Sequence, residues 1–349
     1  MAKRKKVRLK KFPIFILLVL IIGGVYLINN NDSKDESKDK KDNVLKKVIQ
    51  KEKVDIVDVN KTKRDIAVMV NNHPKARPYH SGLDESYLVY EILVEGGYTR
   101  YMALYNDTDT GRIGSVRSSR HYFLDYAMEN DAIYVHWGWS PQAQSDISTL
   151  GINNINGLSY ENLYFYRDKS LNVSLEHTGF TDMEKINAGI KALGYSTKTD
   201  KDVLLNYSVE DVDLTKVENV IMANNVSIPY SSVTETSYVY DPETKMYNRF
   251  VNDTAHVDYV TKEQYAFKNI ITYKLKSTVL DNAGRIELDN IGTGEGYYIT
   301  NGYAVPITWE KTSRKAQTKY YLEDGTELKV SDGNTFIQIQ PTSKTLSIS

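Results

Sequence analysis

Closely spaced turn signals divide the second half of the sequence into short segments. From about Val217 onward, strand-like stretches such as "TSYVYDPETKMYNRFV", "GYYITNGYAVPITW" and "KYYLEDGTELKV" contain Asp-Pro, Asn-Gly and Asp-Gly dipeptides. These dipeptides favour tight turns, and the segments between them leave no room for a long helix. We therefore predict an all-β C-terminal domain over residues 217–349, built as a sandwich or a partly open barrel.

Residues 59–205 alternate strand-like with helix-like runs instead. The predicted strands are rich in β-branched and aromatic residues and comprise Ile66–Val70, Tyr87–Val94, Arg100–Tyr105 and Ala132–His136. Helical patterns lie between and after them. This alternation predicts an α/β N-terminal ectodomain with a central sheet and covering helices.

Two helices in this region have recognisable start signals. A helix over Gln142–Leu150 is predicted because Ser140 is a good N-cap, a proline follows it, and Gly151 stops the pattern. A second helix, in "TDMEKINAGIKALGY", is expected to begin at Thr181 and Glu184, which have the spacing of a capping box.

An apolar run preceded by basic residues occupies the N-terminus. Residues 12–28 read "FPIFILLVLIIGGVYLI", and seven lysines and arginines lie within residues 1–11. The run is long enough to cross a membrane, and its basic flank favours the cytoplasmic side. We predict a basic cytoplasmic tail (1–11), a transmembrane anchor (12–28) and a flexible tether (29–58). The protein would then be a single-pass protein of the cell membrane, with its C-terminal domains on the extracytoplasmic face. A cleaved signal peptide is the alternative, but no Ala-x-Ala site follows the run.

Composition narrows the classes of partner. The chain has no cysteine, which excludes disulfides, a lipid-bearing cysteine and cysteine metal sites. Without the seven N-terminal basic residues, 37 basic side chains face 45 acidic ones, a net charge of −8. Such a domain is a poor binder of nucleic acid, so none is expected as a partner. The 27 tyrosines, against 8 Phe and 3 Trp, suggest wide, half-wet surfaces.

One window of the sequence uses arginine and avoids lysine. Residues 77–167 contain no lysine, although the whole chain has 32 Lys and 12 Arg. The window holds six arginines: Arg77, Arg100, Arg112, Arg117, Arg120 and Arg167. Arginine is needed where a planar, always-charged fork pairs with a carboxylate or a phosphate, or stacks on a ring. This window is therefore where we expect the demanding polar contacts.

The centre of the window reads "RIGSVRSSRH", residues 112–121. We expect "RIG" to end a strand that forms a hairpin with Arg100–Tyr105, and Ser118 or Ser119 to be the N-cap of a helix through "RHYFLDYAMEN". The N–H groups at such a helix start attract anions, and Arg120 and His121 in the first turn oppose the helix dipole. Something negative should therefore lie beside them, either a glutamate of this chain or a bound anion.

The candidate ligand-binding residues combine this segment with residues that follow predicted strands, where α/β sheets place their ligand loops. They are Arg100, Arg117, Ser118, Ser119, Arg120, His121, Asn71, Asn72, His136 and Arg167, with Glu91 and Glu95 as candidate acidic partners. Pairing of the arginines with carboxylates of the same domain is the competing interpretation, and for His136 a buried structural role is the competing one.

Catalytic signatures are missing from the sequence. It has no G-x-S-x-G, H-E-x-x-H, P-loop or G-x-G-x-x-G motif, and its six histidines form no i, i+4 pair. We therefore predict no cofactor and no metal site, and we lean towards a protein that is not an enzyme.

Three long motifs resemble the YerB-like lipoprotein family, a bacterial envelope group of unknown function with two characteristic domains. They are "AVMVNNHPKARPYHSGLDESYLVYEILVEGGYTRYMALY", "RIGSVRSSRHYFLDYAMENDAIYVHWGWSPQA" and "YFYRD", and "GYYITNGYAVPITWEK" is similar to the C-terminal half of the family. The resemblance runs from about residue 60 to the C-terminus. It implies a membrane-attached, extracytoplasmic protein with no established reaction.

The sequence departs from the family pattern at three places. Family members are typically anchored by a lipid on cysteine, which this chain lacks, so a transmembrane helix would replace the lipid. The usual proline of the arginine motif is Ser115, and the usual Pro-His-Asn is Glu176-His177-Thr178. The loss of that asparagine puts any role of the motif in doubt.

Two functions are compatible with these observations. The first is a non-catalytic envelope module with an arginine-lined site for an anionic envelope ligand, or for a protein partner. The second rests on a fainter similarity to the LytR-CpsA-Psr phosphotransferases, which implies transfer from polyprenyl-pyrophosphate-linked wall precursors, with Arg100, Arg117 and Arg120 as phosphate clamps. A third hypothesis gives the arginines a purely structural role.

Overall fold

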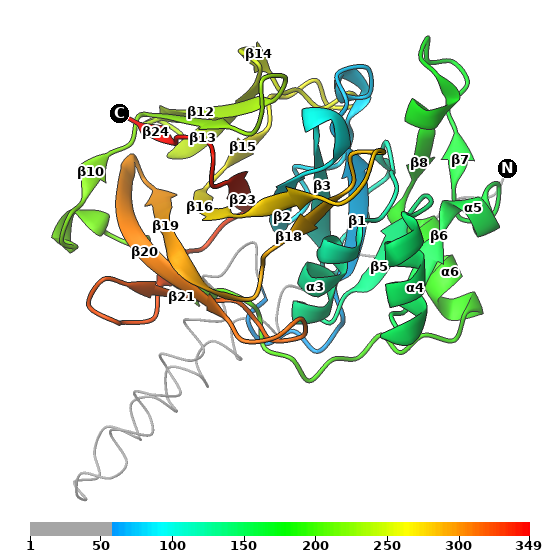
Figure 1. Ribbon diagram of the computed structural model, residues 1–349, viewed down its shortest axis with the longest axis horizontal. Helices are drawn as coiled ribbons and strands as arrows, with labels where there is room; N and C mark the ends of the chain where they lie inside the picture. The colour runs from blue at the N-terminus through cyan, green and yellow to red at the C-terminus, as the bar shows by residue number, and fades with distance from the viewer. Residues whose placement is uncertain (1–57) are drawn as a thin grey trace, which may run out of the picture. The chain divides into compact units, whose positions relative to one another are not determined.

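The main β-sheet takes strands from both halves of the chain. The computed structural model describes residues 58–349. Strand β23, near the C-terminus, lies between β2 and β16 and runs parallel to both (Figure 1). In spatial order the strands are β10 (Ile221–Met222), β20 (Tyr303–Lys311), β19 (Gly292–Thr300), β16 (Asn269–Leu275), β23 (Thr335–Pro341), β2 (Leu88–Leu93), β3 (Thr99–Tyr105), β1 (Ile66–Asn71), β5 (Ile133–His136) and β6 (Asn154–Asn156), with β21 (Lys319–Leu322) paired to β20.

Smaller sheets surround the main one. The largest contains β14 (Thr254–Ala255), β13 (Met246–Val251), β12 (Glu235–Asp241), β11 (Asn225–Pro229) and β24 (Ser347–Ile348), with β15 (Ala266–Phe267) paired to β13. The others are β4 (Ile113–Gly114), β8 (Gly179–Thr181) and β7 (Tyr166–Arg167), then the hairpin β17 (Ser277–Val279) and β18 (Ile286–Leu288), and finally β22 (Lys329–Ser331) with β9 (Asn206–Ser208).

Few helices accompany these strands, and they gather at the β5–β6 end of the main sheet (Figure 1). They are α3 (His121–Glu129), α4 (Pro141–Thr149), α5 (Gly157–Tyr160) and α6 (Met183–Ala192). Single 3-10 turns cover Arg77–Tyr79, Glu95–Gly97, Leu175–His177 and Leu214–Lys216. Helix α3 packs on one face of the sheet through Phe123 and Tyr126, and α6 packs on the other through Ile186 and Ile190.

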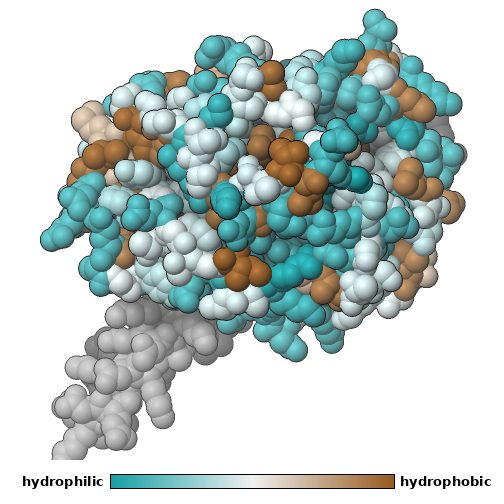
Figure 2. Space-filling view, viewed as in Figure 1, coloured by the Kyte–Doolittle hydropathy of each residue, from teal (hydrophilic) through white to brown (hydrophobic). Residues whose placement is uncertain are grey.

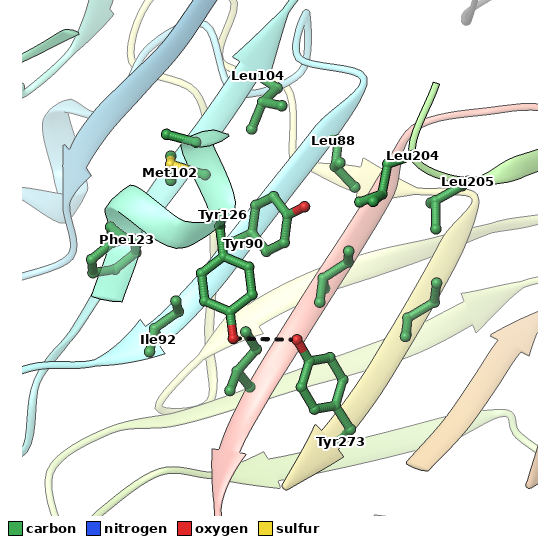
Figure 3. Close-up of a cluster of buried hydrophobic side chains, with 14 of the residues drawn as sticks. Leu88, Tyr90, Ile92, Met102, Leu104, Phe123, Tyr126, Leu204, Leu205 and Tyr273 are labelled. Atoms are coloured by element: carbon green, nitrogen blue, oxygen red, sulfur yellow. Dashed lines mark hydrogen bonds between the residues drawn. The ribbon is translucent and has the colours of Figure 1, made fainter. Parts of the chain in front are cut away.

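Tyrosines fill much of the core. Tyr90 and Tyr126 are fully buried; the Tyr90 hydroxyl donates to Glu129 at 2.7 Å, and the hydroxyl of Tyr273 donates to that of Tyr126 at 3.5 Å (Figure 3). Other buried hydroxyls bond to carboxylates, as Tyr87 does to Asp65 at 2.7 Å. The expectation that the tyrosines mark half-wet surfaces is therefore wrong for these residues, because buried polar partners satisfy their hydroxyls. On the face shown in Figure 2, apolar side chains form small groups among polar ones.

Several predicted elements are confirmed. The protein is a mixed, sheet-rich fold with few helices and a strand-rich C-terminal region. The four predicted N-terminal strands correspond to β1, β2, β3 and β5. The Asp-Pro turn joins β12 to β13 in register, and Ser140 caps α4 by accepting from the Ala143 N–H. Both predicted domains contribute strands to the main sheet, and their boundaries remain predictions.

The predicted hairpin of "RIG" with Arg100–Tyr105 is wrong. Strand β4 pairs with β8, because both edges of β3 are already occupied by β1 and β2. The capping box of the second helix is also displaced by one residue. Thr181 belongs to β8, and Asp182 caps α6 by accepting from the Lys185 N–H at 2.8 Å.

The predicted N-cap of the next helix is wrong as well. Arg120 occupies the N-cap position of α3, and no side chain caps it. Ser119 is held in an extended conformation because its N–H donates to the Gly138 carbonyl at 2.9 Å. Its hydroxyl accepts from the hydroxyl of Tyr134, also at 2.9 Å, so it does not serve the helix.

Among residues 58–349, no helix has both the length and the apolar character needed to cross a membrane. The predicted tail and anchor, and the tether up to residue 57, lie outside the described residues.

Candidate functional site

The segment that carries the central arginines lies between the carboxyl ends of two parallel strands, β1 and β5. The Arg117 N–H donates to the Met69 carbonyl of β1 at 2.9 Å. On the other side, the Trp137 N–H after β5 donates to the Arg117 carbonyl at 3.0 Å. Carboxyl ends of parallel strands are where open sheets place their ligands. These two main-chain hydrogen bonds therefore fix Arg117 at the carboxyl ends of β1 and β5, where such sheets commonly place ligands.

Two arginines from different elements meet one carboxylate, Glu95, in the turn between β2 and β3. Arg120 pairs with both carboxylate oxygens, at 2.8 Å for Nη2 and Oε2. Arg100 lies 4.0 Å from the same carboxylate and donates to the Ser118 carbonyl at 2.5 Å. Burial opposes ionisation of Glu95, but the hydrogen bonds and charge of Arg120 hold its pKa below the usual value. Burial and the neighbouring Arg120 lower the pKa of Arg100 to about 9.

Arg117 faces a different set of partners. It forms an ion pair with Glu176, and this hydrogen bond lowers the pKa of the carboxyl. The next residue, His177, is buried and accepts from the Asn71 amide at 2.9 Å through Nδ1, so its proton lies on Nε2, 3.8 Å from Glu176 Oε1. The ring of His73 stacks on that of His177 and also contacts that of Tyr98, with 4.7 Å between centroids in both cases. Burial lowers the pKa of both histidines, which are therefore neutral at pH 7. The Arg117 cluster is defined as Asn71, His73, Tyr98, Arg117, Glu176 and His177.

This side of the protein carries a local positive charge. Arg100, Arg117 and Arg120 contribute three charges, and Glu95 and Glu176 neutralise two of them. One positive charge is left, in a chain whose residues after the basic tail have a net charge of −8. The predicted negative partner of the arginines is thus present as two glutamates, but the charges do not balance.

The other candidate acidic partner, Glu91, does not meet the arginines of the window's centre. It is fully buried and pairs with Arg249 of β13 at 2.7 Å. Asn72 donates to Glu91 at 3.3 Å and to the Thr99 hydroxyl at 2.7 Å, so it belongs to the interior rather than to an open site.

A chain of buried hydrogen bonds leads from this ion pair towards the Arg117 cluster. Arg249 Nη1 donates to His256 Nδ1 at 2.6 Å, and His256 Nε2 lies 2.7 Å from His80 Nδ1. His80 Nε2 in turn bonds to the Asn71 carbonyl. Because arginine can only donate, each imidazole accepts at Nδ1 and donates at Nε2, which requires both rings to be neutral. Burial lowers the pKa of His80 to about 3 and that of His256 well below its usual value.

The remaining candidates lie apart from the cluster. His136 is buried, with its ring nitrogens bonded to the Gly138 carbonyl at 2.8 Å and to Asn154 at 3.1 Å. The Arg167 guanidinium stacks on Trp137 at 4.1 Å. His121 contacts a different carboxylate from that of Arg117, since its Nε2 lies 3.0 Å from Glu287 of β18.

Within the described residues, the cluster presents hydrogen-bond donors and no grouping expected for nucleophilic catalysis. In residues 58–349 no serine or threonine hydroxyl hydrogen-bonds to a histidine ring. The same part of the chain has no group of three or more His, Asp or Glu side chains placed to hold a metal ion. What remains is a set of donors: the Arg117 fork, the His177 Nε2–H and the arginines around Glu95.

Sequence reasoning missed the histidine side of this cluster. His73 follows Asn71 and Asn72 at the end of the first predicted strand, but the sequence left the role of His177 open, and Asn71 and His177 are 106 positions apart. No local spacing signals their contact, because the loop before β8 brings them together only in the folded chain. The family motif around His177 was the one available hint.

Comparisons with known proteins agree with this architecture. Residues 54–196 match the N-terminal domain of a family described as "Protein of unknown function (DUF3048)", and residues 226–337 match its C-terminal domain. The chain is 31% identical to "Putative lipoprotein YerB" of Bacillus subtilis (strain 168) over 291 residues, which cover 82% of this chain and 84% of YerB. The crystal structure of YerB superposes with a TM-score of 0.72 at 29% identity, covering 82% of this chain and 94% of that one. The chain belongs to the YerB-like family of two DUF3048 domains.

Proposed function

We propose that this protein is a membrane-attached envelope protein that acts by binding rather than by catalysis, with the Arg117 cluster as its anion site. The name of YerB describes a lipoprotein, which supports attachment to a membrane outside the cytoplasm. This chain has no cysteine that could carry a lipid, and the apolar run over residues 12–28 would provide the attachment.

One observation carries the anion site: the carboxylate that pairs with Arg117 is weakly held. The Glu176 side chain is 52% exposed and that of Arg117 is 25% exposed. An ion pair this exposed is worth only about 0–1 kcal/mol. A phosphate group offers the same fork more acceptor oxygens, and it can also accept from the His177 Nε2–H. Glu176 therefore acts as a displaceable stand-in for the anionic ligand.

The phosphotransferase alternative finds less support. It needs carboxylates beside the arginines that are free to hold a divalent cation. Glu95 is engaged by Arg120, and Glu91 is engaged by Arg249 in the interior. No contact of the described residues favours this reaction, so binding is the function proposed.

The test is isothermal titration of inorganic pyrophosphate into the full-length protein in a non-ionic detergent. Arg117→Lys keeps the charge but removes the fork, and we expect it to weaken binding about tenfold. Glu176→Gln removes the internal competitor, and we expect binding up to about fivefold tighter, since the pair is worth at most about 1 kcal/mol.

Glu327→Gln is the matched control, because Glu327 is also exposed and paired with a single cation, Lys319. It should leave the affinity unchanged. The proposal fails if pyrophosphate does not bind the wild-type protein. It also fails if Arg117→Lys and Glu176→Gln both match the control.

A further inference from the structure

A cavity lies where the β17–β18 hairpin meets α3 and the first turn of α4. Its volume is about 380 Å³, within the range of sites that hold small molecules. In Figure 1, β18 lies beside α3, in agreement with the contact between His121 and Glu287. The hairpin cleft is defined by His121, Gln142, Lys276, Glu287, Asp289 and Arg314.

One wall of the cleft is a preformed polar network. Arg314 Nε donates to Asp125 at 2.7 Å, and its Nη2 donates to Asp146 at 2.8 Å. The Asn290 amide donates to the other oxygen of Asp125 at 3.1 Å. Asp125 and Asn290 are both buried. These hydrogen bonds fix the wall without a ligand, and Arg314 forms its ion pairs with two aspartates of the protein itself.

The hairpin strands carry two charged side chains that line the cleft and are not paired in this way. The Asp289 N–H donates to the Lys276 carbonyl at 3.0 Å, which makes the two residues cross-strand neighbours one step beyond the β17–β18 register. Their side chains therefore share one face of the hairpin, and both line the cleft. Yet neither makes an ion pair within 4.0 Å to any described residue. An ammonium and a carboxylate, both without a charged partner, thus face one cavity.

The cleft also offers a histidine ring and an exposed apolar side chain. His121, in the first turn of α3, lines it, and no side chain caps that helix. Leu288 and Ile291 also line the cavity; the Leu288 side chain is buried in the core, whereas that of Ile291 is 46% exposed. A ligand with an aliphatic portion would cover this exposed surface.

We infer that the hairpin cleft binds a free α-amino acid with an aliphatic side chain. A ligand complementary to one unpaired ammonium and one unpaired carboxylate is a zwitterion. In an α-amino acid the two charges sit on one carbon, which suits Lys276 and Asp289, whose Cβ atoms as cross-strand neighbours are about 5 Å apart. The ligand carboxylate pairs with Lys276 and its ammonium with Asp289, while the side chain packs on the exposed Ile291. This site is independent of the Arg117 cluster.

The experiment measures binding of leucine to the full-length protein in a non-ionic detergent, by titration calorimetry and saturation-transfer NMR of the ligand. N-acetyl-leucine, which lacks the ammonium, and leucinamide, which lacks the carboxylate, should each bind about tenfold more weakly than leucine, because each loses one charge pair.

Two variants separate the two ends of the ligand. Lys276→Gln should abolish the preference for leucine over leucinamide, and Asp289→Asn should abolish the preference over N-acetyl-leucine. Both residues are exposed, so the fold is expected to tolerate either change. Lys319→Gln, an exposed lysine outside the cleft, is the control and should change neither preference. Absence of leucine binding at millimolar concentration overturns the inference, as does equal binding of the three compounds or insensitivity to both cleft variants.

Discussion

Replacing Arg249 by methionine tests the central ion pair of the fold. Arg249 and Glu91 are both fully buried, and Arg249 is the one cation within ion-pair distance of Glu91 among the described residues. The substitution leaves the carboxylate with hydroxyl and amide donors, from Thr99, Thr236 and Asn72. Removing one partner of a buried pair costs about 3–5 kcal/mol. His256 also loses the donor to its Nδ1, which adds about 1 kcal/mol.

The measurement is urea unfolding followed by tyrosine and tryptophan fluorescence, with a double-mutant cycle. We expect Arg249→Met to lower the free energy of unfolding by about 4–6 kcal/mol. The Glu91→Gln/Arg249→Met double variant should lose about 2–3 kcal/mol less than the sum of the single variants, because no charge is then left buried. Arg285→Met is the control, since its pair with Asp281 is partly exposed and worth about 0–1 kcal/mol. The reasoning is refuted if Arg249→Met costs no more than the control, or if the cycle shows no coupling.

Two further predictions concern acid stability and close packing. His80 and His256 must be neutral in the folded protein, whereas unfolded histidines take up a proton near pH 6.5. The unfolded state therefore binds more protons below that pH. The free energy of unfolding should fall between pH 6.5 and pH 4.5, by up to about 1.4 kcal/mol per pH unit for each ring. In urea unfolding at several pH values, a His80→Gln/His256→Gln variant should show a shallower dependence on pH, and an equal dependence would contradict the neutral pair. Gly157→Ala should lower the melting temperature, because a Cβ there would lie 2.4 Å from the Trp137 ring, and this overlap should cost about 1–3 kcal/mol. Gly151→Ala is the comparison: its Cβ would meet no atom within 4 Å, but its φ is positive, so it measures backbone strain without overlap.

Local signals predicted the elements that depend on neighbouring residues. The hairpin β12–β13 follows its Asp-Pro turn, and α4 begins at its serine cap, because both are decided by contacts a few residues apart. The helix after "RIGSVRSSRH" also forms, but its start was misplaced. Ser119 is drawn into an extended conformation by Gly138, which lies on a different element.

Partner choice was harder to predict than secondary structure. Glu95 was correctly proposed as a partner of the arginines, since it lies in the turn next to Arg100. Glu91 lies only four residues earlier, yet it points into the core and meets Arg249, 158 positions away. Glu91 lies within β2, whereas Glu95 lies beyond its end in the 3-10 turn, so the two side chains do not follow one strand pattern, and the sequence does not say which strand covers each face of β2.

By itself the sequence determined the strand-rich C-terminal half and several element boundaries, because turn residues and helix caps act through contacts a few residues apart. It also determined the family, because long motifs can be recognised without knowing the fold. Tertiary structure alone decided that β23 joins the two halves in one sheet and that β4 pairs with β8. It also decided that His177 stacks on His73 beside Arg117, and that Lys276 and Asp289 line one cleft without an ion pair to any residue in 58–349. The strand pairings and the stacking of His177 on His73 link residues far apart in the chain, and they form because buried surfaces must be covered and buried polar groups paired, conditions that only the complete fold can satisfy.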